Sequence, residues 1–388
     1  MTASSSPSPP EEQRGGWTGG QYSLYRALLS FAIAGLLAAR LTIVSGPPAA
    51  LLGIGLVGCL LLALGWHDRG VASFLFLLVA TVAALIDGAP LVLPGAGITL
   101  AGILLLFHLA VPPKPFGARD ARGRTDPRGG WHRPRWIGDS AWMLLALVLL
   151  GRGLGRVGDL LSTPAELDFA LLAGVGVLIE IAFALTTFRR SLRPTAWLVM
   201  LLWRIAWIAA FGAAPGEPIL LLLLVFACDP GWWPGRSLEQ TDETSDDAGP
   251  AVLYYDGDCG LCHGFVRLVL CEEATTPEPL RPRFAPLSSE HFARQVADRS
   301  DVDAPTLPDS IVLVLGNGRL LTRSAAVLEI ASRLGGFWRA LSLVGRLLPT
   351  NLLDRGYDGI ARIRKRLTTR PNESCPLLPT DLRTRFES

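Results

Sequence analysis

Charged residues are scarce in this sequence. Asp, Glu, Lys and Arg together make up 18% of its 388 residues, whereas soluble proteins average about 25%. Half of the residues are hydrophobic and the mean hydropathy is +0.37, so the composition indicates an integral membrane protein. The net charge of +2 is too small to indicate a nucleic-acid partner, and we expect none.

The N-terminus lacks the basic segment followed by an apolar stretch that marks a cleaved signal peptide. Its first twenty residues are rich in Ser, Pro, Gly and Glu. We therefore predict a disordered leader over residues 1–22, followed by a transmembrane helical domain over residues 23–236.

Long apolar runs fill residues 23–236. A membrane-spanning helix needs about 20 mostly apolar residues. The candidate runs are Leu24–Val44, Pro48–Trp66, Val71–Asp87, Leu91–Val111, Asp139–Leu161, Leu167–Phe188, Thr195–Phe211 and Pro218–Trp233. The last run is short for a span. The sequence thus predicts a membrane α-helical bundle of about eight spans.

Arginine clusters orient this bundle, because Lys and Arg near span ends stay on the cytoplasmic side. The loop Pro112–Ile137 follows four runs and holds seven Lys or Arg residues against two Asp, and the cluster Arg189–Arg193 follows six runs. Eight spans place everything after Arg236 in the cytoplasm. We predict a multi-pass protein of a bacterial-type plasma membrane with a cytoplasmic C-terminal domain, provided that Pro218–Trp233 crosses the membrane.

A globular domain is expected over residues 251–388, after an acidic linker at residues 237–250. Strands are predicted at Ala251–Tyr255, Arg283–Leu287, Ser310–Leu315 and Arg319–Arg323. Helices are predicted at Gly260–Glu272, at Ser288–Ala297, from a cap at Ser324 to Leu334, and across Phe337–Arg370. This order, with a Cys-x-x-Cys pair directly after the first strand, is typical of an α/β thioredoxin-like domain.

The six cysteines differ in their surroundings. Cys59 and Cys228 lie inside apolar runs and are interpreted as buried small hydrophobes. Cys259 and Cys262 fall at the start of the predicted helix Gly260–Glu272, within one turn of each other, where a disulfide can close. Because the unpaired N–H groups of a helix start favour a thiolate, we expect Cys259 to be the exposed nucleophile and Cys262 the buried resolving thiol.

Three other interpretations of the pair stay open. The run Cys259-Gly-Leu-Cys262-His263 matches the haem-attachment pattern, but the C-terminal domain offers no methionine and only His291 as a second axial ligand. A structural zinc site needs four Cys or His ligands. Cys271 lies about 13 Å along the helix, which leaves Cys375 and one histidine to complete it. Two ordinary buried thiols are the third interpretation. We expect no cofactor and no bound metal.

Asp256 begins the turn between the first strand and the dithiol helix. Its carboxylate can hold the turn by accepting a backbone N–H, or it can take the proton from Cys262 when a mixed disulfide resolves. A carboxylate near a thiolate also raises the thiol pKa, which opposes the helix start. We favour the base role, because Gly257 already suits the turn.

A series of motifs runs through about Val252–Cys375. It comprises Tyr255-Asp256-Gly257-Asp258-Cys259-x-x-Cys262, Phe284-Ala-Pro-Leu287, Asp309-Ser-Ile-Val-Leu313, Ser324-Ala325-Ala326, Leu334-Gly-Gly-Phe-Trp338, Leu348-Pro349, Asp354-x-x-Tyr357-x-x-Ile360-Ala361 and Arg364. The series resembles the DCC family of thiol-disulfide oxidoreductase-like domains. The resemblance implies a thioredoxin-like fold, protein-disulfide oxidoreductase chemistry, and Asp256, Cys259 and Cys262 as site residues. The stretch Asp298–Pro308 departs from the family pattern.

The membrane half has fainter resemblances. Gly138–Trp142 and Leu178–Glu180 are similar to membrane domains of the vitamin-K-dependent-carboxylase-like (HTTM) type, which occur fused to DCC-like domains, and the same helices are similar to DoxX-like proteins, which are tied to thiol redox. Glu180 and Arg204 lie deep in apolar runs, where a charge is costly and faces a partner or a cavity. We predict that both face the bundle interior, and favour a structural ion pair over a substrate or proton site.

The sequence as a whole supports the hypothesis of a membrane-anchored thiol-disulfide oxidoreductase. Its expected partners are protein or small-molecule thiols and disulfides, and the lipid bilayer; the sequence names no electron partner. In the alternative hypothesis the membrane bundle is the catalytic or transport unit, carboxylase-like, quinone-linked or a transporter. The Cys-x-x-Cys domain is then a redox or metal-binding accessory.

Overall fold

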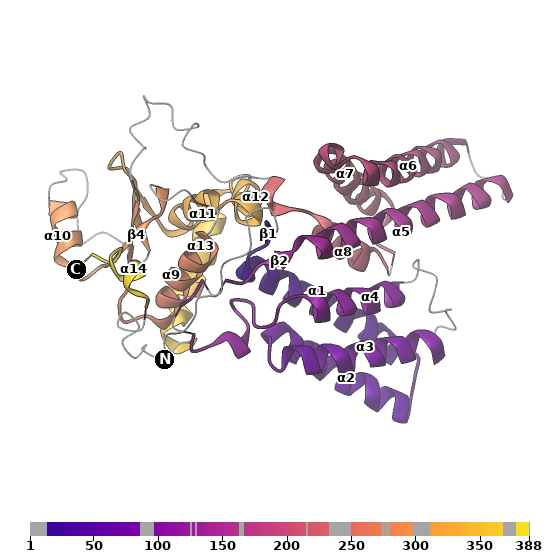
Figure 1. The fold of residues 1–388 in the computed structure, drawn as a ribbon, viewed down its shortest axis with the longest axis horizontal. Coiled ribbons are helices and arrows are strands. Elements are labelled where there is room, and N and C mark those ends of the chain that lie inside the picture. The colour runs from indigo at the N-terminus through magenta and orange to yellow at the C-terminus, as the bar shows by residue number, and fades with distance from the viewer. Residues whose placement is uncertain are drawn as a thin grey trace. The chain divides into compact units, whose positions relative to one another are not determined.

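The computed structural model describes residues 14–85, 97–124, 126–128, 130–162, 167–214, 216–232, 250–273, 276, 280–297, 311–367 and 378–387. The chain divides into two compact units (Figure 1). Unit 1 comprises Met1–Trp17, Tyr22–Arg122 and His132–Asp229, and unit 2 comprises Thr18–Gln21, Gly123–Trp131 and Pro230–Ser388.

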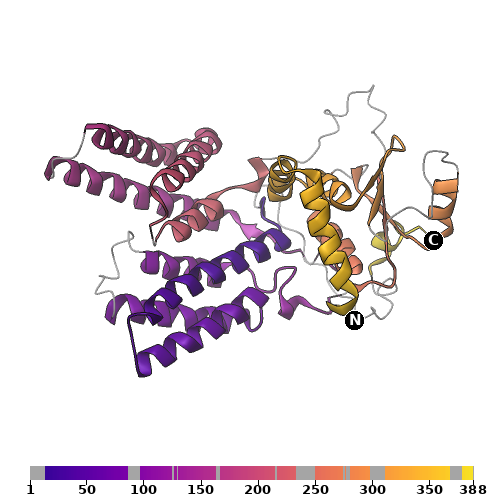
Figure 2. The ribbon, with the colours of Figure 1, turned by 180° about the vertical axis from the view of Figure 1, so that it is seen from behind.

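Unit 1 is helical. Its helices are α1 (Gly19–Leu41), α2 (Pro47–Leu64), α3 (Asp68–Leu85), α4 (Gly97–Ala110), α5 (Arg135–Ser162), α6 (Leu167–Leu185), α7 (Arg193–Phe211) and α8 (Glu217–Ala227). Helices α2, α3 and α4 pack in chain order, and α5 packs along α6 (Figures 1 and 2). Gly65 ends α2 with φ 64° and donates its N–H to the carbonyls of Leu61 and Leu62, a left-handed cap that glycine adopts without a Cβ clash.

Not all of the helices of unit 1 are long enough to span a membrane. Within the described ranges, those long and apolar enough to cross a membrane lie at Gly19–Leu41, Pro47–Leu64, Arg135–Gly158, Leu171–Phe188 and Arg190–Phe211, five in all. Helix α4 has 14 residues and α8 has 11, so α8 is about 16 Å long against a hydrocarbon core of about 30 Å. The expected count of about eight spans is not confirmed.

The shortness of α8 has a local cause that hydropathy misses. The apolar run was expected to continue from Pro218 to Trp233, but Cys228 takes up an extended backbone with φ −64° and ψ 144°. Asp229 and Pro230 follow. Proline biases the residue before it, here Asp229, away from the α region, and helices usually end at or before that residue. Cys228 itself is buried, as expected.

The described part of the predicted leader is ordered, which corrects the expectation of disorder for residues 14–22. Strand β1 (Arg14–Gly15) pairs antiparallel with β2 (Arg133–Pro134), and α1 begins at Gly19. Trp17 is buried, and its indole N–H donates to the carbonyl of Cys228 at 2.8 Å. A buried tryptophan with a satisfied N–H orders this segment. Residues 237–249 of the predicted linker lie outside the described residues.

Unit 2 contains a four-stranded mixed sheet. Its strands are β3 (Val252–Tyr255), β4 (Arg283–Pro286), β5 (Val312–Val314) and β6 (Leu320–Thr322). Their order is β4-β3-β5-β6, with β3 parallel to β4 and antiparallel to β5, and with β5 antiparallel to β6. Leu253 lies in register with Phe284 and Leu313, so these three side chains share one face.

Helices cover both faces of this sheet. The face of Leu253 packs into a core with α9 (Gly260–Glu272) and α11 (Arg323–Leu334). The opposite face, with Tyr254 and Val312, packs against Phe292 of α10 (Glu290–Ala297). Figure 1 shows α9 and α11 on one side of the sheet and α10 on the other. The predicted strands and helices of this region are confirmed, with shorter strands than expected.

Two details of the last helices differ from expectation. Ser324 does not cap α11: the N-cap is Thr322, and the Ser324 hydroxyl donates to Asp354 Oδ1. The expected helical tail is two helices, α12 (Gly336–Gly345) and α13 (Thr350–Leu367), because Pro349 lies between them. Helix α13 packs on α11 and α9, and a short α14 (Thr380–Arg383) follows.

Candidate functional site

The dithiol motif lies where β3 gives way to α9. Cys259 is the N-cap of α9, with an extended backbone at φ −102° and ψ 113°. Its carbonyl accepts the N–H of His263 at 3.1 Å, and its own N–H donates to the carbonyl of Asp256 at 3.2 Å. Cys262 follows in the first turn of the helix. The pair therefore sits at the helix end whose unpaired N–H groups favour negative charge.

Asp256 holds the turn before the helix. Its Oδ1 atom accepts the N–H of Asp258 at 3.0 Å, an Asx-turn that replaces a backbone bond. Asp256 is half-buried and Asp258 is exposed. The structural role that the sequence allowed for Asp256 is thus present in the geometry, and its role as a base stays a prediction.

His263 also belongs to the candidate site, although the sequence indicated it only as part of a haem-attachment pattern. Its Nε2 atom lies 2.8 Å from the carbonyl oxygen of Gly257, which can only accept, so Nε2 carries the hydrogen. The ring also meets the Tyr255 ring edge-to-face, with centroids 5.2 Å apart. His263 therefore ties the first turn of α9 back to the turn that precedes it. The adjacent position in Cys-x-x-Cys-His was the available signal.

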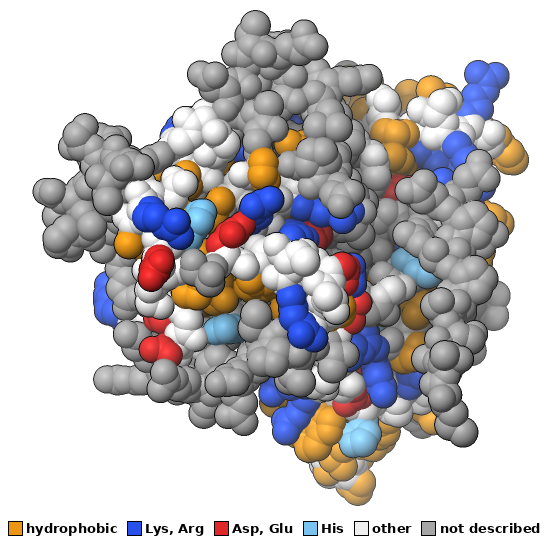
Figure 3. Space-filling view, turned by 60° about the vertical axis from the view of Figure 1, so that its left-hand side comes forward, with side chains coloured by type: hydrophobic (Ala, Val, Ile, Leu, Met, Phe, Trp, Pro, Cys, Tyr) orange, Lys and Arg blue, Asp and Glu red, His pale blue; other side chains and the backbone are white. Residues whose placement is uncertain are grey.

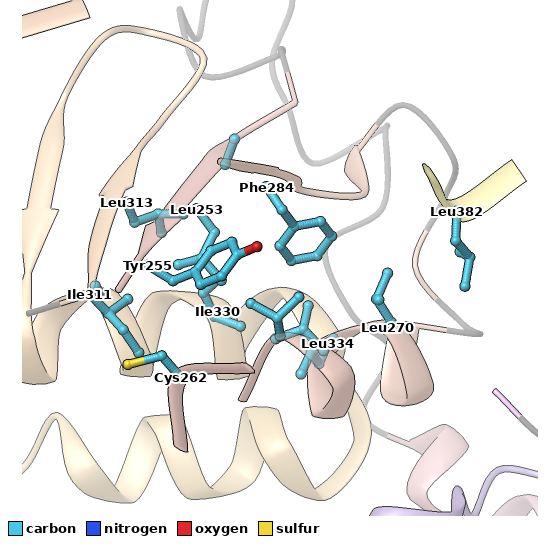
Figure 4. Close-up of a cluster of buried hydrophobic side chains, with 14 of the residues drawn as sticks. Leu253, Tyr255, Cys262, Leu270, Phe284, Ile311, Leu313, Ile330, Leu334 and Leu382 are labelled. Carbon is cyan, nitrogen blue, oxygen red and sulfur yellow. The ribbon is translucent and has the colours of Figure 1, made fainter. Parts of the chain in front are cut away.

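Both cysteines of the pair are buried as free thiols. Cys259 and Cys262 are each 3% exposed. Both belong to the core cluster that includes Tyr255, Val266 and Ile311, and Figure 4 shows Cys262 in this cluster next to Ile311. The burial expected for Cys262 is confirmed. The exposure expected for Cys259 is wrong, because the core of unit 2 reaches the N-cap position.

The other end of α9 carries a third cysteine, Cys271, which the sequence excluded from a shared zinc site, and a carboxyl group, Glu272, which the sequence did not single out. Glu272 is 1% exposed. It accepts hydrogen bonds from the hydroxyl of Thr18, the N–H of Gly20 at 2.7 Å and the indole N–H of Trp338 at 2.6 Å. Burial raises the pKa of Glu272, and the three donors oppose that shift.

Gly20 and Cys271 complete this second cluster. A Cβ on Gly20 would lie 2.6 Å from Glu272 Oε1, so the approach of the carboxylate requires glycine. Burial raises the pKa of Cys271, and the neighbouring Glu272 raises it further. Cys271 is therefore held as a neutral thiol, which is a poor nucleophile.

The charges expected inside the bundle are paired, as predicted. Glu180 is fully buried and Arg204 is 1% exposed, and Arg204 donates to Glu180 Oε1. Arg156 donates to the same oxygen at 3.1 Å, and Arg152 donates to Glu217 at 2.5 Å. Glu217, at the start of α8, also lies 3.6 Å from Arg204, and it was not foreseen because only the packing of α8 on α5 and α7 brings it to these arginines. The pair is thus part of a five-residue cluster drawn from α5, α6, α7 and α8.

A second buried chain of polar groups lies elsewhere in unit 1. The Tyr22 hydroxyl is 2.5 Å from His108 Nδ1, and His108 Nε2 is 3.0 Å from Asp68 Oδ1. The guanidinium of Arg26 lies 3.6 Å from the same carboxylate. All four side chains are buried. They come from α1, α3 and α4, so only the packing of these helices brings them together.

Among the residues that the structure describes, no group of three or more His, Cys, Asp or Glu side chains is arranged to hold a metal ion. Cys375, the remaining ligand of the zinc interpretation, lies outside the described residues.

On the face of unit 2 that Figure 3 turns to the viewer, acidic and basic side chains are interspersed around hydrophobic ones. A partner docking there would meet both signs of charge.

The segment that carries the dithiol is similar to known proteins. Residues 253–370 match the family model of the DCC1-like thiol-disulfide oxidoreductases. The resemblance to the DCC family is thereby confirmed over those residues, which include Asp256, Cys259 and Cys262. The chain is also similar to YuxK of Bacillus subtilis (strain 168), described as an uncharacterized protein, with 29% identity over 143 residues, 37% of this chain and 98% of YuxK. No solved structure matches the chain.

Proposed function

We propose that the protein is a membrane-anchored thiol-disulfide oxidoreductase that works through Cys259 and Cys262. The observation that carries this function is the placement of Cys259 at the N-cap of α9, with Cys262 in the first turn, inside the segment that matches the oxidoreductase family. A helix start stabilises a thiolate, and a thiolate is the species that attacks a disulfide.

The reaction proceeds in two exchanges. The thiolate of Cys259 attacks one sulfur of a partner disulfide, the partner S–S bond breaks, and a mixed disulfide forms as one partner thiolate leaves and takes up a proton. Cys262 then loses its proton and attacks the Cys259 sulfur, which closes the intramolecular disulfide and releases the second partner thiol. The partner gains two electrons and two protons, and the dithiol loses them. The reverse sequence oxidises a partner dithiol.

The topology supports a thioredoxin-like domain. The order β3-α9-β4-α10-β5-β6-α11, with β3 parallel to β4 and an antiparallel pair at the other edge, is the plan that the sequence pattern indicated. In that plan the dithiol follows the first strand at the start of the first helix. Both sulfurs are buried in the present state, so a partner must open the site locally before Cys259 can attack.

A trapping experiment on the full chain tests this function. With Cys262→Ser, the mixed disulfide on Cys259 cannot resolve, so a covalent adduct with a disulfide-bearing partner should accumulate on non-reducing gels. With Cys259→Ser no adduct should form, and Cys271→Ser, matched in residue type and helix, should behave like the parent. Adducts that depend on Cys271 rather than Cys259 would refute the assignment.

The reduction potential of the pair gives the direction of electron flow. A value near about −270 mV suits a reductant and one near about −120 mV an oxidant. It can be measured on the full protein in detergent by equilibration with glutathione or dithiothreitol buffers, with Cys262→Ser as the control that cannot close a disulfide.

Membrane attachment rests on the five apolar helices, and the proposed side of unit 2 is the cytoplasm. The support is the arginine content of the loops: Arg189, Arg190 and Arg193 cluster between α6 and α7, and the loop before α5 is basic. The five span-length helices alone would place unit 2 opposite these arginines, so the cytoplasmic side requires that the chain cross the membrane once more after α7, in the segment from α8 to Trp232. A reporter fused after Ser388 should be active only in the cytoplasm; activity outside would place the dithiol in an oxidising compartment.

A second candidate function places the activity in unit 1, as a catalyst or transporter that the dithiol serves. It is favoured by the five-residue charge cluster around Glu180, since buried ionisable groups in membrane helices line proton or substrate paths more often than chance. Complementation of a deletion strain separates the two functions. If the dithiol carries the function, the Cys259→Ser variant should fail to complement the deletion. If the charge cluster carries it, only the Glu180→Gln variant, present at the same protein level, should fail to complement.

A further inference from the structure

Helices α12 and α13 of unit 2 expose a hydrophobic surface. Its core, here called the α12–α13 surface, consists of Leu343, Val344, Leu347, Leu352, Ile360 and Ile363, which are between 47% and 83% exposed. Leu352, Ile360 and Ile363 follow a spacing of eight and three residues along α13, so they form one stripe. Leu347, in the corner between the two helices, is the most exposed of the six.

The opposite side of α13 binds the rest of unit 2. The hydroxyl of Tyr357 accepts the N–H of Ile311 at 2.9 Å. Asp354 accepts the N–H and the hydroxyl of Ser324, and Asp358 lies 3.6 Å from Arg323. The acidic groups of α13 are thereby held against α11 and the sheet, away from the hydrophobic stripe.

Arginines remain on the outer side. Arg355 and Arg362 are exposed, and neither forms an ion pair with another described residue of the chain. Arg355 precedes Gly356, the position between Leu352 and Ile360 on the stripe, and Arg362 is next to Ile363 in sequence, so both cations border the hydrophobic stripe. An exposed apolar stripe bordered by arginines is the composition of a helix that lies in the interface of an anionic bilayer.

We propose that the α12–α13 surface docks on the surface of the bilayer that holds unit 1, with Arg355 and Arg362 against anionic headgroups. The proposal rests on the membrane attachment given under Proposed function. The same chain supplies both the five apolar helices and this surface, so a bilayer is present wherever unit 2 is. A lipid surface also satisfies both features at once, because its headgroups pair with arginine and its acyl boundary receives leucine and isoleucine.

Docking has a consequence for the dithiol. Helix α13 packs directly on α9, whose first turn carries Cys262, and Tyr357 holds Ile311 of the cluster that contains both cysteines. The lipid-facing stripe is then on the outer side of a helix that packs on the dithiol helix itself. The expected partners are cysteines of membrane proteins close to the headgroups rather than freely diffusing proteins.

Hydrogen–deuterium exchange on the full protein in nanodiscs tests the docking. Peptides covering residues 341–363 should exchange more slowly in discs with about 30% phosphatidylglycerol than in discs of phosphatidylcholine alone. Two arginines at an anionic surface change binding by about 30-fold, so Arg355→Glu with Arg362→Glu should abolish the difference between the lipids. Arg294→Glu with Arg319→Glu, exposed arginines on α10 and in the β5–β6 turn, is the matched control and should keep it.

Three outcomes would overturn the proposal. Slow exchange that persists in detergent without lipid would mean that protein covers the surface. Slow exchange only in discs loaded with two copies would make the occupant a second chain. Exchange that is insensitive to lipid charge and to the Arg355/Arg362 variant would remove the lipid contact. Exchange needs no thiol chemistry, so it is read separately from the Cys262→Ser trap: a failed trap with intact lipid protection rejects the proposed function alone.

Discussion

The two ends of α9 present the same pair of side chains in opposite settings. At its N-terminal end, Cys259 follows the half-buried Asp256, whose carboxylate bonds the turn. At its C-terminal end, Cys271 precedes the buried Glu272, whose carboxyl group accepts a hydroxyl, a backbone N–H and an indole N–H. Both cysteines are buried, so burial alone does not distinguish a reactive thiol from a structural one.

The difference lies in the helix and in the carboxyl group. The N-terminal end offers unpaired N–H groups to a thiolate, and the C-terminal end offers carbonyl oxygens, which repel one. Beside Cys271, burial and Glu272 both raise the thiol pKa. A single helix thus carries the thiol that we propose for exchange at one end and, at the other, a buried thiol whose pKa is raised.

The largest expected effect is the difference between removing the thiol at one end of α9 and removing the thiol at the other. Cys259→Ser should lower the rate of dithiol exchange by about a thousandfold or more, since the nucleophile is lost. Cys271→Ser should leave the rate within about twofold. Initial rates of reduction of a fluorescent disulfide substrate measure both. Comparable losses in the two variants would erase the distinction between the ends of α9.

Alkylation without a partner sharpens the comparison. At pH 7.5 iodoacetamide should modify Cys259 about a hundredfold faster than Cys271, because the raised pKa of Cys271 leaves almost no thiolate. Peptide mass spectrometry over a time course gives the two rates. Equal rates would show that opening of the core, and not the helix end, governs reactivity.

The carboxyl group at the N-terminal end is tested by Asp256→Asn, which keeps an acceptor for the Asp258 N–H and removes the base. If Asp256 takes the proton of Cys262, resolution of the mixed disulfide should slow by about tenfold near pH 6, a modest figure beside the usual contribution of a general base. Stopped-flow thiol release between about pH 6 and 9 measures it. Unchanged rates across that range would show that Asp256 only holds the turn and does not act as a base.

The smallest effect concerns Glu272 and the stability of the protein. Its pKa is raised in the folded state, so the protonated form is favoured there, and this contribution is fully present below the unfolded pKa and is lost as pH rises through the folded pKa. Relative to Glu272→Gln, which does not titrate, the parent should gain about 2–4 °C in melting temperature between pH 8 and pH 4.

Glu290→Gln is the control for that series. Glu290 is exposed at the start of α10, and its replacement should leave the pH dependence of melting as in the parent. A Glu272→Gln protein that follows the same pH dependence as the parent would contradict the raised pKa of the buried Glu272.

Much of the dithiol end was predictable because its determinants are local. The bounds Gly260–Glu272 follow from the apolar spacing of the helix, and its start follows from the turn residues before Cys259. The exposure of Cys259 was not predictable, because it depends on Tyr255 and Ile311, which belong to strands and loops that meet the N-cap only in the folded core. The base role of Asp256 and the side of unit 2 remain predictions.

The C-terminal end of α9 shows the limit in another way. Glu272 and Thr18 are 254 residues apart, and no periodicity relates them. In unit 1, the prediction that Glu180 and Arg204 face inward followed from the cost of a charge in lipid, but the choice of Glu217 as a further partner followed from the packing of α8. The length of α8 depended on Cys228–Pro230, which a hydropathy window averages away.

Residues within a few turns of one another are enough to predict the apolar character of the helices in unit 1, the linear order of strands and helices in unit 2, and the Cys-x-x-Cys spacing at a helix start. They are not enough to predict which thiols are buried, which carboxyl groups find donors and which face of α13 is left outside. Those properties arise from contacts between segments far apart in the chain, where burial removes water and makes each available partner decisive.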